Sequence, residues 1–168
     1  NVLKRAKELA EDGVELFSST SLKYFLYNQI SENNFNDETL NMFSELDDYD
    51  VLSAIKEWSN HEDKVLSLLS KMIIHRKLLR IEIQQKEFEK SDLDNKIKTV
   101  ARKLNLSNNE AKFFVFSKKI SNQAYQQEKP IFILNKKGNI KDIAQASDQL
   151  NLQALTTPVI KHFICYPK

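Results

Sequence analysis

The sequence has little of what cross-links small secreted domains or breaks helices. Its 168 residues contain one cysteine, two glycines and three prolines. The single cysteine, Cys165, excludes an internal disulfide and any zinc site built from several cysteines of this chain. Because no signal peptide is visible either, we expect a cytoplasmic protein. No apolar run approaches the ~18 residues of a membrane span, so we expect no membrane partner.

Charge of one sign is also scarce. Lys and Arg number 25 against 23 Asp and Glu, so the formal net charge is only +2. The basic residues are scattered among nearly as many acids and no groove-reading module is recognised, so nucleic acid is not expected as a partner. Hydrophobic residues make up 41% of the chain and charged residues 29%, which is the composition of a globular protein.

The scarcity of turn formers favours helices in the first half of the chain. All three prolines lie in the last quarter, so the first 90 residues read almost without interruption. An apolar period of about 3.6 residues predicts helices over 2–17, 22–30, 34–46, 46–60 and 61–90. The side chains that we expect to face inward are Leu40, Phe43, Leu52, Ile55, Trp58, Val65, Leu66, Leu69, Met72 and Ile73.

The pattern changes after residue 90. We expect one more helix over 91–106, capped by Ser91 or Asp92, and a turn of helix over 145–150. Runs rich in β-branched and aromatic residues predict strands over 112–120, 130–138, 139–143 and 159–167. The turn sequence "NKKGN" predicts a hairpin between the second and third of these strands.

These patterns predict a mainly α fold with a C-terminal α+β unit. A helical bundle over 1–90 would be followed, over 91–168, by a small antiparallel sheet of about four strands with one main helix.

No arrangement of residues predicts catalysis. His61, His75 and His162 lack the spacing of metal ligands. Cys165 lies in an apolar strand pattern, which favours a buried thiol over a nucleophile. Two glycines cannot build a phosphate-binding loop, and no nucleophile elbow is present. We therefore assign no catalytic and no metal-ligating residue.

Two acidic clusters admit either a structural or a metal-binding interpretation. In "HED" (61–63) and "ELDDYD" (45–50), carboxylates could attract a cation, or they could cap the helix that follows. Capping is the favoured interpretation for both, with Asp47 or Asp48 as the cap in the second cluster. For the helix expected over 34–46, we predict Asn36 or Asp37 as the cap.

The stretch "MIIHRKLLRIEI" (72–83) combines apolar and basic residues. On the expected helix, Arg76 and Arg80 lie one turn apart, where like charges repel by roughly 0.2–0.5 kcal/mol. Either this is a solvated face, or one paired with carboxylates from another helix, or the two guanidinium groups clamp a phosphate-bearing ligand. The sequence leaves these alternatives open. His75 and Lys77 are further candidates for such a site.

The order of several motifs resembles a known family. "FLYNQI", then "LDDYDVLSAIKEWSNHEDKVLSLLSKMIIHRKLLRIEI", then a C-terminal "IFIL…KKG…VIKHFICYPK" looks like the C-terminal half of HD-domain phosphohydrolases. The similar members are bacterial dGTPase-like proteins and the SAM-and-HD-domain dNTP triphosphohydrolases. The resemblance covers nearly the whole chain, most firmly residues 46–83.

The resemblance implies a division of labour within a longer protein. Family members bind a divalent metal through an H…HD…D set in their N-terminal half, and no histidine of this chain is followed by Asp. It therefore implies a non-catalytic regulatory and assembly portion, whose partners are the N-terminal HD portion and further copies. Arg76 and Arg80 match positions that bind a regulatory nucleotide in relatives, while Leu79 stands where those relatives often have an aromatic residue.

A structural interaction module is the alternative hypothesis. It would hold no ligand, and the helices would complete the core of the longer protein. It predicts an exposed apolar patch along Val2, Leu3, Ala6 and Leu9.

Overall fold

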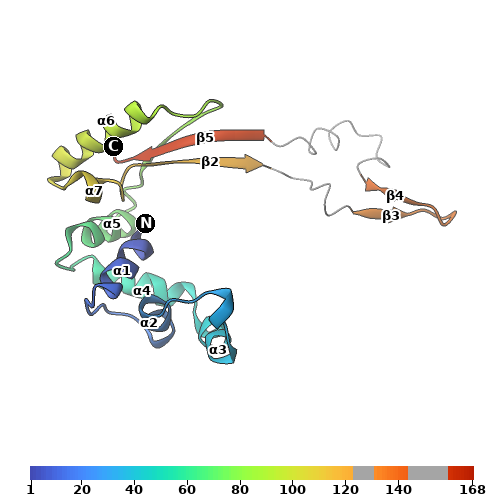
Figure 1. Ribbon diagram of the computed structural model, residues 1–168, viewed down its shortest axis with the longest axis horizontal. Helices are drawn as coiled ribbons and strands as arrows, with labels where there is room; N and C mark the ends of the chain where they lie inside the picture. Colours follow the sequence, from blue (N-terminus) through green and yellow to red (C-terminus); the bar gives the residue numbers. More distant parts are fainter. Residues whose placement is uncertain (123–130, 144–158) are drawn as a thin grey trace.

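The computed structural model describes residues 1–122, 131–143 and 159–168, and has the predicted mainly α architecture with an antiparallel sheet. The turn of helix expected over 145–150 lies outside the described residues. The elements, shown in Figure 1, are α1 (Val2–Glu11), α2 (Thr20–Tyr27), a 3-10 turn (Glu32–Asn34), α3 (Asp37–Glu45), α4 (Asp48–Trp58), α5 (Lys64–Ile74), β1 (Arg80–Gln84), α6 (Lys90–Leu104), α7 (Asn108–Ala111), β2 (Phe116–Asn122), β3 (Phe132–Leu134), β4 (Ile140–Asp142) and β5 (Val159–Tyr166).

Side-chain caps fix where several helices begin. Ser19 caps α2. Asn36 caps α3 and Asp47 caps α4, which decides the two choices that the sequence left open. These side chains accept hydrogen bonds from N–H groups that have no partner within the helix. The caps predicted for the helix over 91–106 are wrong, because α6 begins earlier and has Glu89 at its N-cap position.

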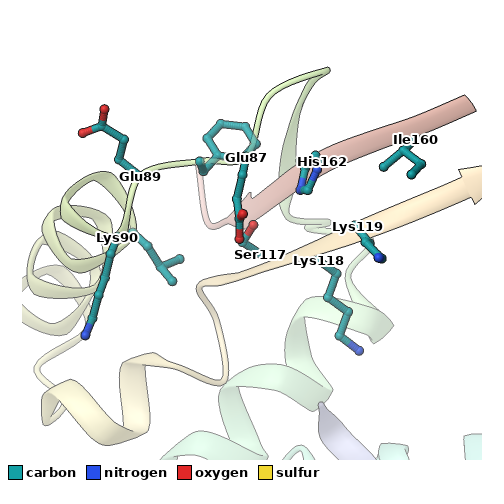
Figure 2. A pocket seen from close by; sticks show the side chains of 10 residues that line it. Glu87, Glu89, Lys90, Ser117, Lys118, Lys119, Ile160 and His162 are labelled. Atoms are coloured by element: carbon teal, nitrogen blue, oxygen red, sulfur yellow. The ribbon is translucent and has the colours of Figure 1, made fainter.

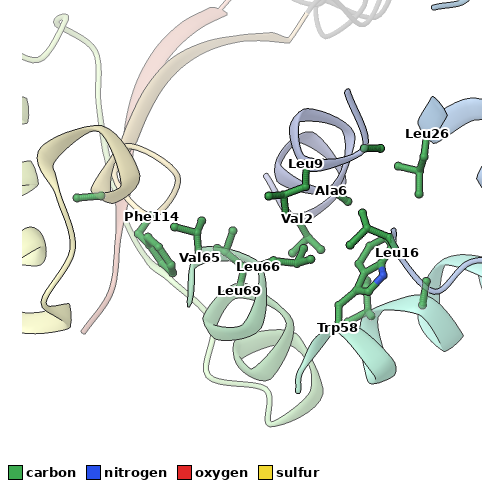
Figure 3. Packing of buried hydrophobic residues seen from close by; sticks show 14 of the residues in the cluster. Val2, Ala6, Leu9, Leu16, Leu26, Trp58, Val65, Leu66, Leu69 and Phe114 are labelled. Carbon is green, nitrogen blue, oxygen red and sulfur yellow. The ribbon is translucent and has the colours of Figure 1, made fainter. Parts of the chain in front are cut away.

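The core lies between α1, α2, α4 and α5 and continues to α6 and α7. Figure 3 shows Val65, Leu66 and Leu69 of α5 among residues of α1, with Phe114 approaching from the other side. Trp58 is buried, and its indole N–H donates to the Phe17 carbonyl over 2.9 Å. Of the predicted inward side chains, Ile55, Trp58, Val65, Leu66 and Leu69 are confirmed as buried, and Met72 is partly buried.

Other inward predictions are wrong. Leu40, Phe43, Leu52 and Ile73 are exposed. The α3 helix instead buries Thr39, whose hydroxyl lies 2.9 Å from the Tyr24 hydroxyl, so it meets α2 through a polar contact. The apolar period of α3 thus faces away from the core.

The predicted apolar patch on the first helix is also wrong. Val2, Ala6 and Leu9 are buried against α5 and its neighbours, and only Leu3 of that set is exposed. The first helix, expected to reach residue 17, ends at Glu11. Gly13, with φ +83°, follows it in the left-handed conformation that favours glycine.

The long helix predicted over 61–90 is the largest error. The α5 helix ends at Ile74, and Arg76 has φ +53°. The Arg76 N–H donates to the Ile73 carbonyl (3.1 Å) and the Lys77 N–H to the Met72 carbonyl (2.8 Å), a two-bond helix ending that normally has glycine in place of Arg76. The alternating "RIEIQ" that follows forms β1 because β5 offers it a partner.

The described strands form two sheets. β1, β5 and β2 lie side by side in that order, with both neighbouring pairs antiparallel. β3 and β4 form the predicted hairpin, in which the Asn135 side chain accepts from the Lys137 and Asn139 N–H groups, each over 3.0 Å. β1 comes from the first predicted unit but joins the C-terminal sheet, and the division at residue 90 stays a prediction.

Candidate functional site

The basic residues singled out from the sequence lie on the turn between α5 and β1, which we call the basic turn (residues 75–80). His75, Arg76, Lys77 and Arg80 are all exposed there. They do not share a helical face, because α5 ends at Ile74, just before His75, and Arg80 begins β1. Four helical residues rise about 6 Å, whereas four extended ones span up to about 14 Å. The one-turn spacing of Arg76 and Arg80 is therefore corrected.

Arg80 has neighbours on the sheet. Its Nε lies 4.0 Å from the Glu82 carboxylate, and its guanidinium carbon lies 6.0 Å from the centre of the Tyr166 ring. The Arg80 side chain is 62% exposed, so this long ion pair contributes little to stability. Within the described residues, the Arg76 side chain makes no ion pair or hydrogen bond.

Glu82 is the centre of a cluster with Arg80, Lys96 and Tyr166, here called the Glu82 cluster. The sequence did not reveal this cluster. The Tyr166 hydroxyl donates a hydrogen bond to the Glu82 carboxylate. Lys96 of α6 lies 3.5 Å from the same carboxylate and 3.7 Å from the Tyr166 ring centre. The pKa of Glu82 is lowered, chiefly by the Tyr166 hydrogen bond and further by the charges of Lys96 and Arg80. Tyr166 is far from Glu82 along the chain, so no local pattern could pair them.

An apolar cavity of about 390 Å³ borders the basic turn. Half of the residues in the stretch 72–83 line this cavity, and Lys77 is among them. Cys165 lines it on the side of the sheet. Burial raises the pKa of the Cys165 thiol, and the predicted buried cysteine is confirmed. The lining residues are Asn1, Val2, Leu69, Met72, Ile73, Lys77, Leu78, Leu79, Ile81, Phe113, Phe116 and Cys165.

A second, larger cavity of about 980 Å³ lies between the start of α6 and strands β2 and β5. Its wall includes His162 and lysines, but also Glu87 and Glu89, so charges of both signs line it. Figure 2 shows Lys118 extending to the opposite side of the sheet from His162. These polar groups do not converge on one point, and the arrangement identifies no ligand.

The acidic clusters serve as helix caps. Asp63 accepts the Leu66 N–H over 2.8 Å and caps α5, and Asp47 forms a reciprocal cap with Asp50 at the start of α4. His61 accepts the Asp63 N–H over 2.9 Å. In the described part of the chain, no three His, Cys, Asp or Glu side chains are grouped so that they could hold a metal. The same part contains no helix long and apolar enough to cross a membrane.

Comparison with solved structures shows a likeness to a phosphohydrolase. No protein-family model matches the sequence, and no curated protein does. A crystal structure of a phosphohydrolase from Bacteroides thetaiotaomicron superposes with a TM-score of 0.85 at 40% sequence identity. The match covers 99% of this chain but only 42% of the phosphohydrolase chain. The chain is therefore related, over almost all of its length, to less than half of a phosphohydrolase.

Proposed function

We propose that this chain is the C-terminal, non-catalytic part of a metal-dependent, HD-type nucleotide phosphohydrolase, with a role in regulation and assembly. The observation that carries the proposal is the 40% identity over 99% of this chain with a phosphohydrolase of which it spans 42%. The order of motifs over residues 46–83 supports the HD type and the C-terminal position. Such enzymes cleave phosphate bonds with a metal-activated water.

The divalent metal belongs, in this proposal, to the N-terminal HD portion. The described residues of this chain do not fit a metal, because they offer no cluster of three suitable ligands. We therefore assign this chain no step of the hydrolysis. Its contribution is to bind, position and assemble.

The basic turn is the proposed effector site. Arg76 is without a side-chain partner in the described chain, and the contacts of the Arg80 guanidinium there are a carboxylate 4.0 Å away and the Tyr166 ring, whose centre is 6.0 Å away. Both guanidinium groups can therefore reorient at little cost toward phosphate oxygens, which they bind through two parallel hydrogen bonds. A triphosphate has oxygens on three phosphate groups, so separated basic groups can bind different phosphates, and Lys77 and His75 belong to the same turn. This geometry replaces the helical clamp expected from the sequence.

An effector bound at the basic turn would promote assembly. If the nucleotide binds more tightly to an oligomer, then by reciprocity the oligomer is stabilised by the nucleotide to the same extent. A homo-oligomer in which a neighbouring copy contacts the same nucleotide satisfies this requirement.

The test uses the longer phosphohydrolase that contains this chain. Arg76→Gln and Arg80→Gln should each weaken GTP or dNTP binding, measured by calorimetry, and reduce nucleotide-dependent oligomerisation measured by light scattering. Arg102→Gln, on the last turn of α6, is the matched control. Unchanged nucleotide affinity in both variants would remove the effector site.

A structural interaction module without a ligand remains the second candidate. Its support is the number of large apolar side chains that are exposed on α3, α4, the basic turn and the sheet. In that case, the longer protein would assemble equally well with and without nucleotide. Light scattering across a nucleotide titration separates the two candidates.

A further inference from the structure

The two faces of the three-stranded sheet differ in chemistry. In antiparallel strands, residues that pair directly share a face, and successive residues alternate between faces. Glu82 and Tyr166 therefore lie on the face that α6 covers, where Lys96 reaches them. The opposite face, here named the groove face, comprises Ile81, Ile83, Phe116, Lys118, Ile120, Val159, Lys161, Phe163 and Cys165.

The described residues cover the groove face only in part. Helices α1 and α5 approach this face at the end that contains Cys165. There, the 390 Å³ cavity lies between the helices and the sheet. Figure 1 shows β2 and β5 continuing beyond these helices. Ile81 and Ile83 are each 57% exposed, and Ile120 and Val159 are exposed as well. Leu78 of the basic turn, at 70% exposure, extends the same apolar surface across the cavity.

This surface is larger than the cavity. Leu78 and Ile81 line the cavity, but Ile83, Ile120 and Val159 do not. A small molecule that fills the cavity would leave these three side chains in water. A protein segment that places one large apolar side chain in the cavity and continues along the strands would cover them all.

The charge of the surface is of one sign. The groove face carries Lys118 and Lys161, and Lys77 stands in the cavity wall. None of the residues of the groove face or the cavity lining is acidic. A segment with Asp or Glu beside its apolar residues would pair with these lysines, whereas a basic segment would be repelled.

We propose that the cavity and the groove face form a docking site for an acidic amphipathic protein segment with one large apolar anchor. The anchor enters the cavity between Leu78 and Cys165, and the acidic residues lie near Lys77, Lys118 and Lys161. This site shares Lys77 with the proposed effector site but, unlike that site, needs neither Arg76 nor Arg80. It explains the apolar half of the stretch 72–83, just as phosphate binding would explain the basic half.

The experiment uses the 168-residue chain and a synthetic amphipathic helix with Leu and Trp on one face and Glu on the other. We expect saturable binding by fluorescence anisotropy, and slower maleimide alkylation of Cys165, the only thiol, when peptide is bound. Replacing Glu by Lys in the peptide should weaken binding by roughly tenfold or more, and added salt should weaken it too.

Matched variants locate the site. Leu78→Ser and Lys77→Glu should each weaken binding by roughly tenfold. Leu52→Ser and Lys56→Glu make the same chemical changes on the exposed surface of α4 and should leave affinity unchanged. Circular dichroism shows whether each variant is folded. Because Leu78 and Lys77 are exposed, we expect both substitutions to leave the protein folded.

Five results would overturn the proposal. These are equal affinity for the Glu and Lys peptides, binding without protection of Cys165, and equal effects of Lys77→Glu and Lys56→Glu. The fourth is self-association of the chain without peptide that Leu78→Ser abolishes, which would identify a second copy as the occupant. The fifth is binding of decanoate that protects Cys165 to the same extent as the peptide does. This result would identify a small amphiphile as the occupant of the cavity. A failed GTP titration would leave all these outcomes unaffected.

Discussion

Arg5 and Asp63 form a two-point ion pair between the first turn of α1 and the start of α5. Arg5 Nη2 lies 2.7 Å from Asp63 Oδ2, and Arg5 Nε donates to Oδ1 over 3.2 Å. The two side chains are 20% and 15% exposed. Because Asp63 also caps α5, one carboxylate fixes both the start of that helix and its contact with α1.

We predict that Asp63→Asn lowers the free energy of unfolding by about 1–3 kcal/mol. Asn preserves the cap, so the change isolates the ion pair. The expected loss lies between that of exposed pairs (about 0–1 kcal/mol) and fully buried ones (about 3–5 kcal/mol). Urea unfolding at neutral pH measures it, with Asp12→Asn as an exposed control. Equal stability of Asp63→Asn and the unaltered protein would mean that the ion pair contributes nothing to the free energy of unfolding.

The same pair makes stability depend on pH. Burial raises the pKa of Asp63, but hydrogen bonds from Arg5 and the Leu66 N–H, with the charges of Arg5 and His61, outweigh it and lower the pKa. The contribution of the ionised Asp63 carboxylate to the free energy of unfolding is therefore complete above the pKa of the unfolded state, about 3.9. It is lost as the pH falls through the lower pKa of the folded state. Urea unfolding over this range should show a weaker pH dependence for Asp63→Asn. Parallel curves for the two proteins would contradict the assignment.

Arg76 occupies a backbone position suited to glycine, so Arg76→Gly should stabilise the protein. Its φ of +53° costs a residue with a side chain about 1 kcal/mol, and its guanidinium group makes no compensating contact in the described chain. We expect a gain of about 1 kcal/mol in urea unfolding. Gly13→Ala is the reverse experiment, because Gly13 has φ +83° with open space around it and ends α1 in the same way. It should cost about 1 kcal/mol.

If Arg76→Gly is instead destabilising, Arg76 makes a contact that the structure does not contain. The combination of higher stability with weaker nucleotide binding is the specific signature of the proposal. It would show that the residue is retained for its ligand at the expense of the fold.

Two serines of α5 should respond in opposite ways to loss of their hydroxyl. Within the described residues, the Ser70 hydroxyl is fully buried without a hydrogen-bond partner, so Ser70→Ala should be neutral or stabilising by about 1 kcal/mol. The Ser67 hydroxyl donates to the Ser59 carbonyl over 2.7 Å, so Ser67→Ala should cost about 1 kcal/mol. Thermal unfolding of both variants checks the pair. A clear loss of stability in Ser70→Ala would indicate a buried water or an undetected bond.

The Glu82 cluster gives a prediction in terms of pKa. Removing the hydroxyl in Tyr166→Phe removes the main cause that lowers the pKa of Glu82, so this pKa should rise toward its ordinary value. Carbon NMR of the side-chain carboxyls, titrated with acid, measures the change. Tyr49→Phe, on the exposed surface of α4, should leave it unchanged. An unaltered Glu82 titration in Tyr166→Phe would show that Lys96 and Arg80 dominate instead.

Features that depend on neighbouring residues were predictable. The caps Asn36 and Asp47 act within one helical turn, and the hairpin of β3 and β4 is set by a turn that contains Asn135 and Gly138. The buried face of α5 follows from its own period. The alternating pattern of "RIEIQ", which is typical of a strand, was also present in the local sequence. The apolar period of α5 runs into it, however, and predicts a continuous helix instead.

The candidate site depended on distant partners and so was not predictable in detail. The basic turn could be found from composition, because four basic or potentially basic residues interrupt an apolar run. Its geometry could not, because β1 exists only through its pairing with β5, which begins 75 residues after β1 ends. The cavity and the groove face likewise combine α1, α5 and three strands from distant parts of the chain.

The sequence by itself determined the helix caps, the hairpin, the mainly α composition and the identity of the basic residues, since each of these rests on local hydrogen bonding or side-chain chemistry. Only the tertiary structure decided that α5 stops at Ile74, that α1 is buried, and that one sheet face remains apolar and basic. A strand needs a partner for its backbone hydrogen bonds, and burial needs a neighbour, and both came from residues far away in the chain.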